Sequence, residues 1–179
     1  MTSNILELPK WFIADMWSPF PINPECLRGI ENMHVLVDCQ NTVAEHFFGE
    51  AGCDQLRREI VAILREIGVE GDRERMTGVP AIPGLLVMVN LEEEGEKVQL
   101  HVGAAVWICN DLPSGAKASD QPDHGWLGYS RCIKFPLPIP KGPGVSAICF
   151  QSAVLLIHDF VNNFLQHNPG REDGRDPDR

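Results

Sequence analysis

The sequence predicts an α+β fold in a single domain, in which an antiparallel sheet is packed by a central amphipathic helix and a C-terminal helix. Three observations support this class. Residues 56–67 carry an apolar stripe at helical spacing, residues 85–109 hold two strand-like runs around a turn, and residues 146–168 form a long apolar segment without proline. With 179 residues and 44% hydrophobic content, the chain is long enough to bury about 70% of its unfolded surface in one core.

The first 30 residues predict an extended arm or a wrapping strand rather than a helix. Trp11, Phe12, Trp17 and Phe20 stand among four prolines, which remove backbone donors and favour extended geometry in the residue before them. Two placements of the aromatic side chains remain open. The arm packs on its own domain, or it docks on a neighbouring subunit with its aromatic residues as anchors.

A strand and a short helix are expected next. Residues 33–38 form an apolar, β-branched run that is typical of a strand. Thr42 stands three residues before Glu45, which is the spacing of a capping box, so we expect a helix to begin there. Gly49 and Gly52 are expected to interrupt this helix.

A second, amphipathic helix should follow, capped by Asp54 and ended by Gly68. Its apolar residues recur at helical spacing on one side, with arginine and glutamate opposite them. The apolar stripe consists of Leu56, Ile60, Ile63, Leu64 and Ile67.

The most regular pattern is an antiparallel strand pair over residues 85–90 and 97–109, joined by an acidic turn in which Gly95 can adopt a positive φ. In the second strand, alternation predicts one buried face and one partly wet face. The buried face is expected to hold Val98, Leu100, Val102, Val106 and Ile108, and the other face Gln99, His101 and Trp107.

The remaining segments complete the fold. Residues 110–126 have the composition of a long loop, 126–135 of another strand, and 136–144 of an extended proline-rich connection. Residues 146–168 are expected to form the closing helix, although their first residues could also end a strand. The chain then divides into an arm (1–30), an α+β domain (31–168) and a disordered charged tail (169–179).

Charge and hydropathy exclude several classes of partner. Fifteen Lys and Arg against 25 Asp and Glu give a formal net charge of −10, which would repel a phosphate backbone, so no nucleic-acid partner is expected. The N-terminus lacks the pattern of a secretory signal, and the run 153–157 is too short to span a bilayer. We therefore expect no membrane partner, no secretion by a signal peptide, and a location in the cytoplasm or in a virion.

The sequence contains no recognisable cofactor or metal motif. Its glycines form no nucleotide-binding loop, and its six cysteines lack the closely spaced pairs of a structural zinc site, so neither a cofactor nor a metal is expected. Cys39 follows Asp38 and lies near His34 and His46 in sequence, which could assemble an activated nucleophile. A buried, inert Cys39 is favoured, and no catalytic residue is assigned.

The order of elements over residues 54–110 resembles that of small tail-terminator and tail-completion proteins of tailed bacteriophages. The resemblance rests on a helix ending in glycine, the entry VPAIPG, and the hairpin runs LLVMVN and VQLHVGAAVWICND. It implies a structural virion subunit that closes into a ring and presents its sheet edge, long loop and N-terminal arm to neighbouring proteins. It carries no catalytic residues.

The expected function is therefore a non-catalytic assembly protein that acts through protein–protein contacts and forms a homo-oligomer. An acidic inhibitor or immunity-type binding protein is an alternative, and a Cys/His-dependent enzyme is a second one. The expected interface residues are Trp11, Phe12, Trp17, Phe20, Trp107 and Trp126.

Overall fold

Seven strands form one mixed sheet in the computed structural model, which describes residues 7–18, 27–72, 83–108 and 126–170. Along the chain the elements are α1 (Lys10–Asp15), β1 (Met16–Trp17), β2 (Asn32–Cys39), α2 (Thr42–Phe47), α3 (Gly49–Glu66), β3 (Glu70–Asp72), β4 (Pro83–Glu94), β5 (Lys97–Ile108), β6 (Trp126–Lys134), β7 (Ile139–Pro140) and α4 (Gly144–His167). The predicted α+β class is confirmed.

The strand order is β1-β6-β5-β4-β2-β3, with β7 paired to one end of β5. The predicted hairpin is present, because β4 and β5 pair antiparallel from Pro83↔Ile108 to Glu94↔Lys97, and Gly95 in the turn has φ +61°. Two pairings differ from a purely antiparallel sheet: β2 lies parallel to both β4 and β3. The helical connection that precedes β3 and β4 permits this parallel arrangement.

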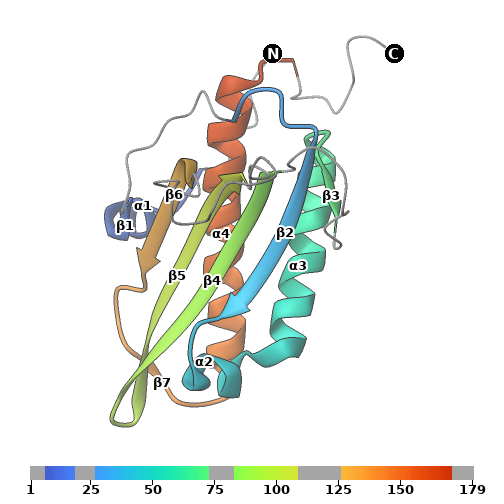
Figure 1. The fold of residues 1–179 in the computed structure, drawn as a ribbon. Coiled ribbons are helices and arrows are strands. Elements are labelled where there is room, and N and C mark those ends of the chain that lie inside the picture. Colours follow the sequence, from blue (N-terminus) through green and yellow to red (C-terminus); the bar gives the residue numbers. More distant parts are fainter. Residues whose placement is uncertain (1–6, 19–26, 73–82, 109–125, 171–179) are drawn as a thin grey trace, which may run out of the picture.

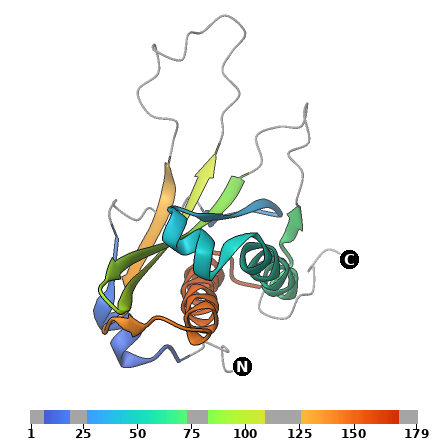
Figure 2. The same cartoon turned by 90° about the horizontal axis from the view of Figure 1, so that it is seen from below.

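The described residues form two layers (Figure 1), with α3 and α4 on one face of the sheet and none of the described helices on the opposite face, as the end-on view shows (Figure 2). Every second residue of the central strands points toward the helices and is buried. In β4 these are Leu85, Val87, Val89 and Leu91, and in β5 they are Val98, Leu100, Val102 and Val106. The hydrophobic core therefore lies between the sheet and the two long helices.

The helix α3 uses the predicted stripe: Leu56, Ile60, Ile63, Leu64 and Ile67 are all buried. It ends as predicted at Gly68, whose φ is +72°, and the amides of Gly68 and Val69 donate to the carbonyls of Arg65 and Leu64. This pair of hydrogen bonds is a Schellman motif, which satisfies carbonyls that the helix end leaves open.

The predicted start of α2 and α3 was wrong in detail. The cap of α2 is Asn41 rather than Thr42, because the Asn41 side chain accepts the amide of Ala44. Gly52 does not interrupt a helix and Asp54 does not begin one, since α3 runs without a break from Gly49. Gly52 instead lies against the Phe48 ring, which a Cβ at residue 52 would approach to 2.8 Å.

The N-terminal segment also differs from the prediction, which was an extended arm that contains no helix. Residues 10–15 form α1, which starts directly after Pro9, where a missing amide is tolerated. Phe12 is fully buried, and β1 pairs antiparallel with β6 through Met16↔Ile133 and Trp17↔Cys132. Residues 10–17 thus belong to the core and to the sheet. Of the loop expected over residues 110–126, residues 110–125 lie outside the described residues, as does most of the charged tail, and Trp126 begins β6 instead.

Candidate functional site: the open face of the sheet

The sheet face that carries no helix is more apolar than a solvated face requires. Two rows of register partners cross it. One row joins Leu36, Leu86, Ala105 and Ser130 across β2, β4, β5 and β6. The next joins Asp38, Met88, Gly103, Cys132 and Trp17 across five strands and ends on β1.

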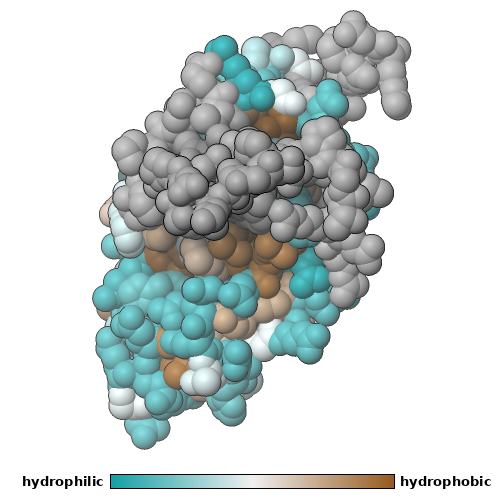
Figure 3. Space-filling view, viewed as in Figure 1, coloured by the Kyte–Doolittle hydropathy of each residue, from teal (hydrophilic) through white to brown (hydrophobic). Residues whose placement is uncertain are grey.

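The side chains of this face leave apolar surface in contact with solvent. Leu36 is 38% exposed and Trp17 is 54% exposed, while Leu86, Met88 and Cys132 are half-buried. We call these five residues the open-face patch. The space-filling view shows brown, hydrophobic surface over the strands on this face of the molecule (Figure 3). A sheet with one wet face normally alternates apolar-in and polar-out, so an apolar outer face indicates a contact surface.

Gly103 shapes the centre of the patch. A Cβ at residue 103 would lie 3.2 Å from Met88 Cε and 3.4 Å from Cys132 Sγ. Because Gly103 has no side chain, the Met88 side chain can extend over β5 toward Cys132. Methionine is flexible and polarizable, and it is common on surfaces that bind proteins. The patch is therefore flat and adaptable at its centre.

Polar groups surround the patch. Lys134 and Asp38 are exposed, and His34 lies beside Leu36 on the same strand face with its buried Nδ1 lacking a hydrogen-bond partner. Toward the hairpin tip, Glu92 lies 3.6 Å from His101 and Glu93 lies 2.8 Å from Lys141. The hydrogen bond from Lys141 holds the pKa of Glu93 below its usual value. Of these two glutamates at the hairpin tip, Glu93 is thus paired with a lysine of its own chain.

The six interface residues expected from the sequence lie in different environments. Trp17 lies on the open-face patch, and Trp11 is 36% exposed on α1, where its ring stacks edge-on to Phe135 at 5.4 Å. Phe12 is fully buried in the core of its own chain, so its expected role at an interface was wrong. Trp107 and Trp126 are register partners at the end of the β5–β6 pair, but their side chains, like Phe20, lie outside the described residues.

An activated nucleophile is the less favoured alternative that the sequence leaves open for Cys39, whose hydrogen-bond partner among the described residues is another thiol and which is half-buried rather than buried. Its Sγ contacts Cys53 Sγ at 3.4 Å, and Asp38 Oδ2 accepts a hydrogen bond from Gln40. Burial raises the pKa of Cys53 and of Cys149 to about 12, which disfavours their thiolates. Within the described part of the chain, no group of three or more His, Cys, Asp or Glu side chains is placed to hold a metal ion.

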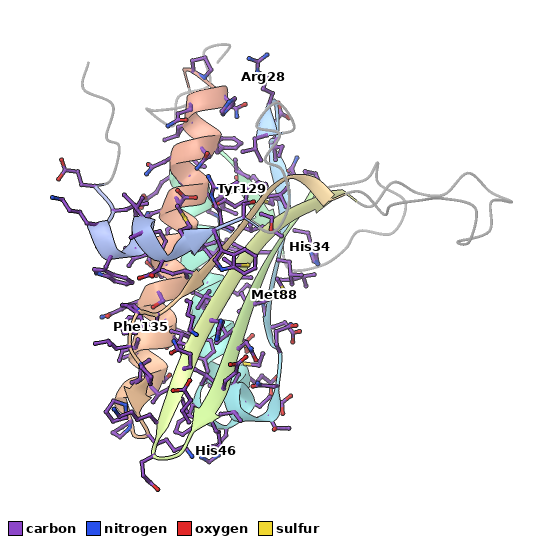
Figure 4. The ribbon with its side chains drawn as sticks, turned by 90° about the vertical axis from the view of Figure 1, so that its left-hand side faces the viewer. Arg28, His34, His46, Met88, Tyr129 and Phe135 are labelled. Atoms are coloured by element: carbon purple, nitrogen blue, oxygen red, sulfur yellow. The ribbon has the colours of Figure 1, made fainter. Side chains whose placement is uncertain are left out.

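A polar cluster joins β6 to α4 through Tyr129, which Figure 4 labels. The Tyr129 hydroxyl donates to Asp159 Oδ2 at 2.8 Å, and Arg131 Nε lies 3.4 Å from the same oxygen. Burial, together with the neighbouring Asp159 charge, holds the pKa of Tyr129 well above its usual value. The residue pattern of β6 does not predict this cluster. Asp159 lies on α4, a different element later in the chain, and its position in the sequence indicates only a polar residue on a helix.

Tyr129 makes the alkaline stability of the protein measurable, since it is the only tyrosine in the chain. Its folded pKa is raised, so its contribution to stability is complete below the unfolded pKa of about 10 and is lost as pH rises above that value. We expect the tyrosinate absorption band to appear together with the loss of circular dichroism. Tyrosinate formation near pH 10 (about the free value) in a protein that is still folded would contradict the buried placement.

The apolar run 153–157 is too short to cross a bilayer, whereas α4 as a whole is long and apolar enough by composition. Its most apolar 18-residue window has a mean hydropathy of 1.6, and 50% of that window is buried inside the protein. A helix at the centre of a folded domain has the same composition, and ten residues of α4 are buried, where the helix packs against the sheet and α3.

No protein-family model matches the chain, and no curated protein matches it. Among solved structures, the chain is similar to PelC dodecamers from Paraburkholderia phytofirmans. One has 12% identity and a TM-score of 0.34, covering 80% of this chain and 92% of the other, and a second has 13% identity and a TM-score of 0.35 with 80% and 93% covered. A DUF330 protein from Xanthomonas campestris has 9% identity and a TM-score of 0.36, covering 83% of this chain and 90% of its own. TM-scores of this size do not establish a shared fold.

Proposed function

We propose that this protein is a non-catalytic assembly subunit that associates with copies of itself through the open-face patch. The observation that supports the proposal is the patch itself: Trp17, Leu36, Leu86, Met88 and Cys132 form one apolar area on a sheet face that none of the described helices covers. An apolar centre inside a polar rim is the arrangement found in protein interfaces, where a few buried aromatic and apolar side chains supply most of the affinity.

A second copy of the chain is the occupant that the charges favour. Asp38 is the one acidic side chain in the two rows, so the patch itself has little negative charge with which to attract a basic partner. Two flat sheet faces also pack well on each other, at a separation of about 10 Å. Soluble oligomers are most often built from identical subunits.

Mass measurement of the full chain in solution, over a range of concentrations, tests the proposal. We expect the unmodified protein to self-associate, and we expect Leu36→Glu or Leu86→Glu to weaken that association by about tenfold or more, because each buries a charge in the apolar centre. Leu137→Glu is the matched control: Leu137 is 70% exposed and lies beyond β6, away from the two rows. Circular dichroism confirms that each variant is folded.

A monomer at every concentration would overturn the proposal and favour the acidic binding protein that the composition also allows. Equal loss of association in Leu137→Glu would show that the contact lies elsewhere on the molecule. The resemblance to phage tail-terminator proteins adds a finer form of the same proposal, in which the copies close into a ring. A ring would give one discrete mass well above that of a dimer, with no intermediate masses at high concentration.

A further inference from the structure

Two cysteine sulfurs are in contact at the lower end of the helix layer. Cys39 is the last residue of β2, Cys53 lies in the second turn of α3, and their Sγ atoms are 3.4 Å apart. A disulfide bond is about 2.05 Å long, so the two sulfurs need to approach by only roughly 1.4 Å to bond. Small rotations of the two side chains can supply that movement.

The backbone segments that carry the two thiols are both held in place. The Gln40 amide donates to the Val89 carbonyl at 2.8 Å, which anchors the chain immediately after Cys39. Gly52, next to Cys53, packs under the Phe48 ring so closely that no Cβ would fit there. The contact between the sulfurs is thus a consequence of how β2 and α3 are fixed against each other.

The two thiols differ in exposure. Cys39 is half-buried, whereas Cys53 is 7% exposed. A reagent in solution therefore meets Cys39 first, and Cys53 is reached only from Cys39. This is the arrangement of an attacking thiol with a second thiol beside it that can complete the exchange.

We propose that Cys39 and Cys53 form a modification site that reacts with a low-molecular-weight disulfide and closes into a reversible intramolecular disulfide. In the first step the Cys39 thiolate attacks one sulfur of the small disulfide, whose S–S bond breaks and releases one small thiolate. In the second step Cys53 loses its proton and attacks Cys39 Sγ, which releases the second small thiol. Two protein thiols are oxidised, and the small disulfide takes up both electrons and both protons as two thiols.

The surroundings of Cys53 slow both the formation of this disulfide and its reduction. Burial, the hydrogen bond with Cys39, and the charges of Cys39 and Asp38 raise the pKa of Cys53 to about 12, against a smaller opposite effect of Arg57. A reductant that attacks the accessible Cys39 sulfur must expel Cys53, and a thiol of high pKa is a poor leaving group. Once closed, the bond would tie β2 to α3 and enclose α2 in the resulting loop.

The experiment uses the full chain, folded and fully reduced, in anaerobic mixtures of oxidised and reduced glutathione. After alkylation of free thiols, trypsin releases residues 29–57 as one peptide, because no Lys or Arg stands between Arg28 and Arg57. We expect this peptide to lose the mass of two hydrogen atoms and to carry no alkyl group. A glutamate-specific protease then separates it into pieces that remain linked through Cys39 and Cys53. The oxidised protein should also melt roughly 5–10 °C higher.

Three variants make the result decisive. Cys53→Ser should leave glutathione attached to Cys39, and Cys39→Ser should leave Cys53 unreacted because it is buried. Cys149→Ser, which removes the fully buried cysteine of α4, should close the Cys39–Cys53 bond as the unmodified chain does. Alkylation of both cysteines at every glutathione ratio, or closure of Cys39 onto Cys149 instead, would overturn the proposal. Neither result bears on self-association, which rests on the opposite face of the sheet.

Discussion

Replacing Phe160 with alanine is expected to lower the free energy of unfolding by about 4 kcal/mol, the typical loss for a fully buried phenylalanine. Phe160 has no exposed surface and lies on the side of α4 that faces the sheet. Its ring meets the Tyr129 ring edge-on at 5.2 Å and lies 6.2 Å from the Phe164 ring. The substitution therefore removes a large apolar side chain and two aromatic contacts, and it leaves a cavity between α4 and β6.

Denaturant unfolding followed by circular dichroism measures this loss. Phe150→Ala is the matched control, because Phe150 is on the same helix and is only partly buried against the core. We expect the control to lose less than half as much stability. Equal losses for the two variants would mean that α4 does not pack on the sheet through the face that carries Phe160.

The elements that the sequence predicted well are those whose signal is local. The α3 stripe and its end at Gly68 lie within one helix, and the β4–β5 hairpin is specified by alternation on either side of Gly95. Each pattern needs only the residues of its own segment, because helical and strand spacing decide which side chains share a face. These parts of the fold followed directly from the residues.

Pairing between distant strands could not be predicted in the same way. The alternation in β2 fits a parallel or an antiparallel neighbour equally well, so its parallel pairing with β4 depends on the tertiary fold. The short β1 reaches β6 across more than 100 residues of sequence. In the run LLVMVN both faces are apolar, so the sequence alone could not tell that Leu86 and Met88 face away from the helices.

The candidate site was predicted in part. The sequence pointed to contacts made by aromatic residues, and Trp17 does lie at the edge of the open-face patch, whereas Phe12 is in the core. The contact of Cys39 with Cys53 could not be predicted from the cysteine spacing, because a separation of 14 residues matches no metal or redox motif. It arises only when β2 and α3 pack together.

Replacing Asp159 with alanine is expected to lower the free energy of unfolding by about 3 kcal/mol, because it removes the acceptor of one buried donor and one partly buried donor at once. Without the Asp159 carboxylate, the Tyr129 hydroxyl loses a 2.8 Å hydrogen bond inside the core, and the Arg131 guanidinium loses its partner at 3.4 Å. Arg131 keeps some contact with solvent, so its share of the loss is smaller than for a fully buried ion pair.

Comparison with Tyr129→Phe separates the two donors. That variant removes one hydroxyl and leaves the Asp159–Arg131 pair intact, so we expect a loss of about 1 kcal/mol. In the double variant, the loss should fall short of the sum of the two single losses, since the hydrogen bond from Tyr129 to Asp159 can be removed only once. Strict additivity would contradict the hydrogen bond, and an unchanged stability of Asp159→Ala would show that β6 and α4 are held together by apolar packing alone.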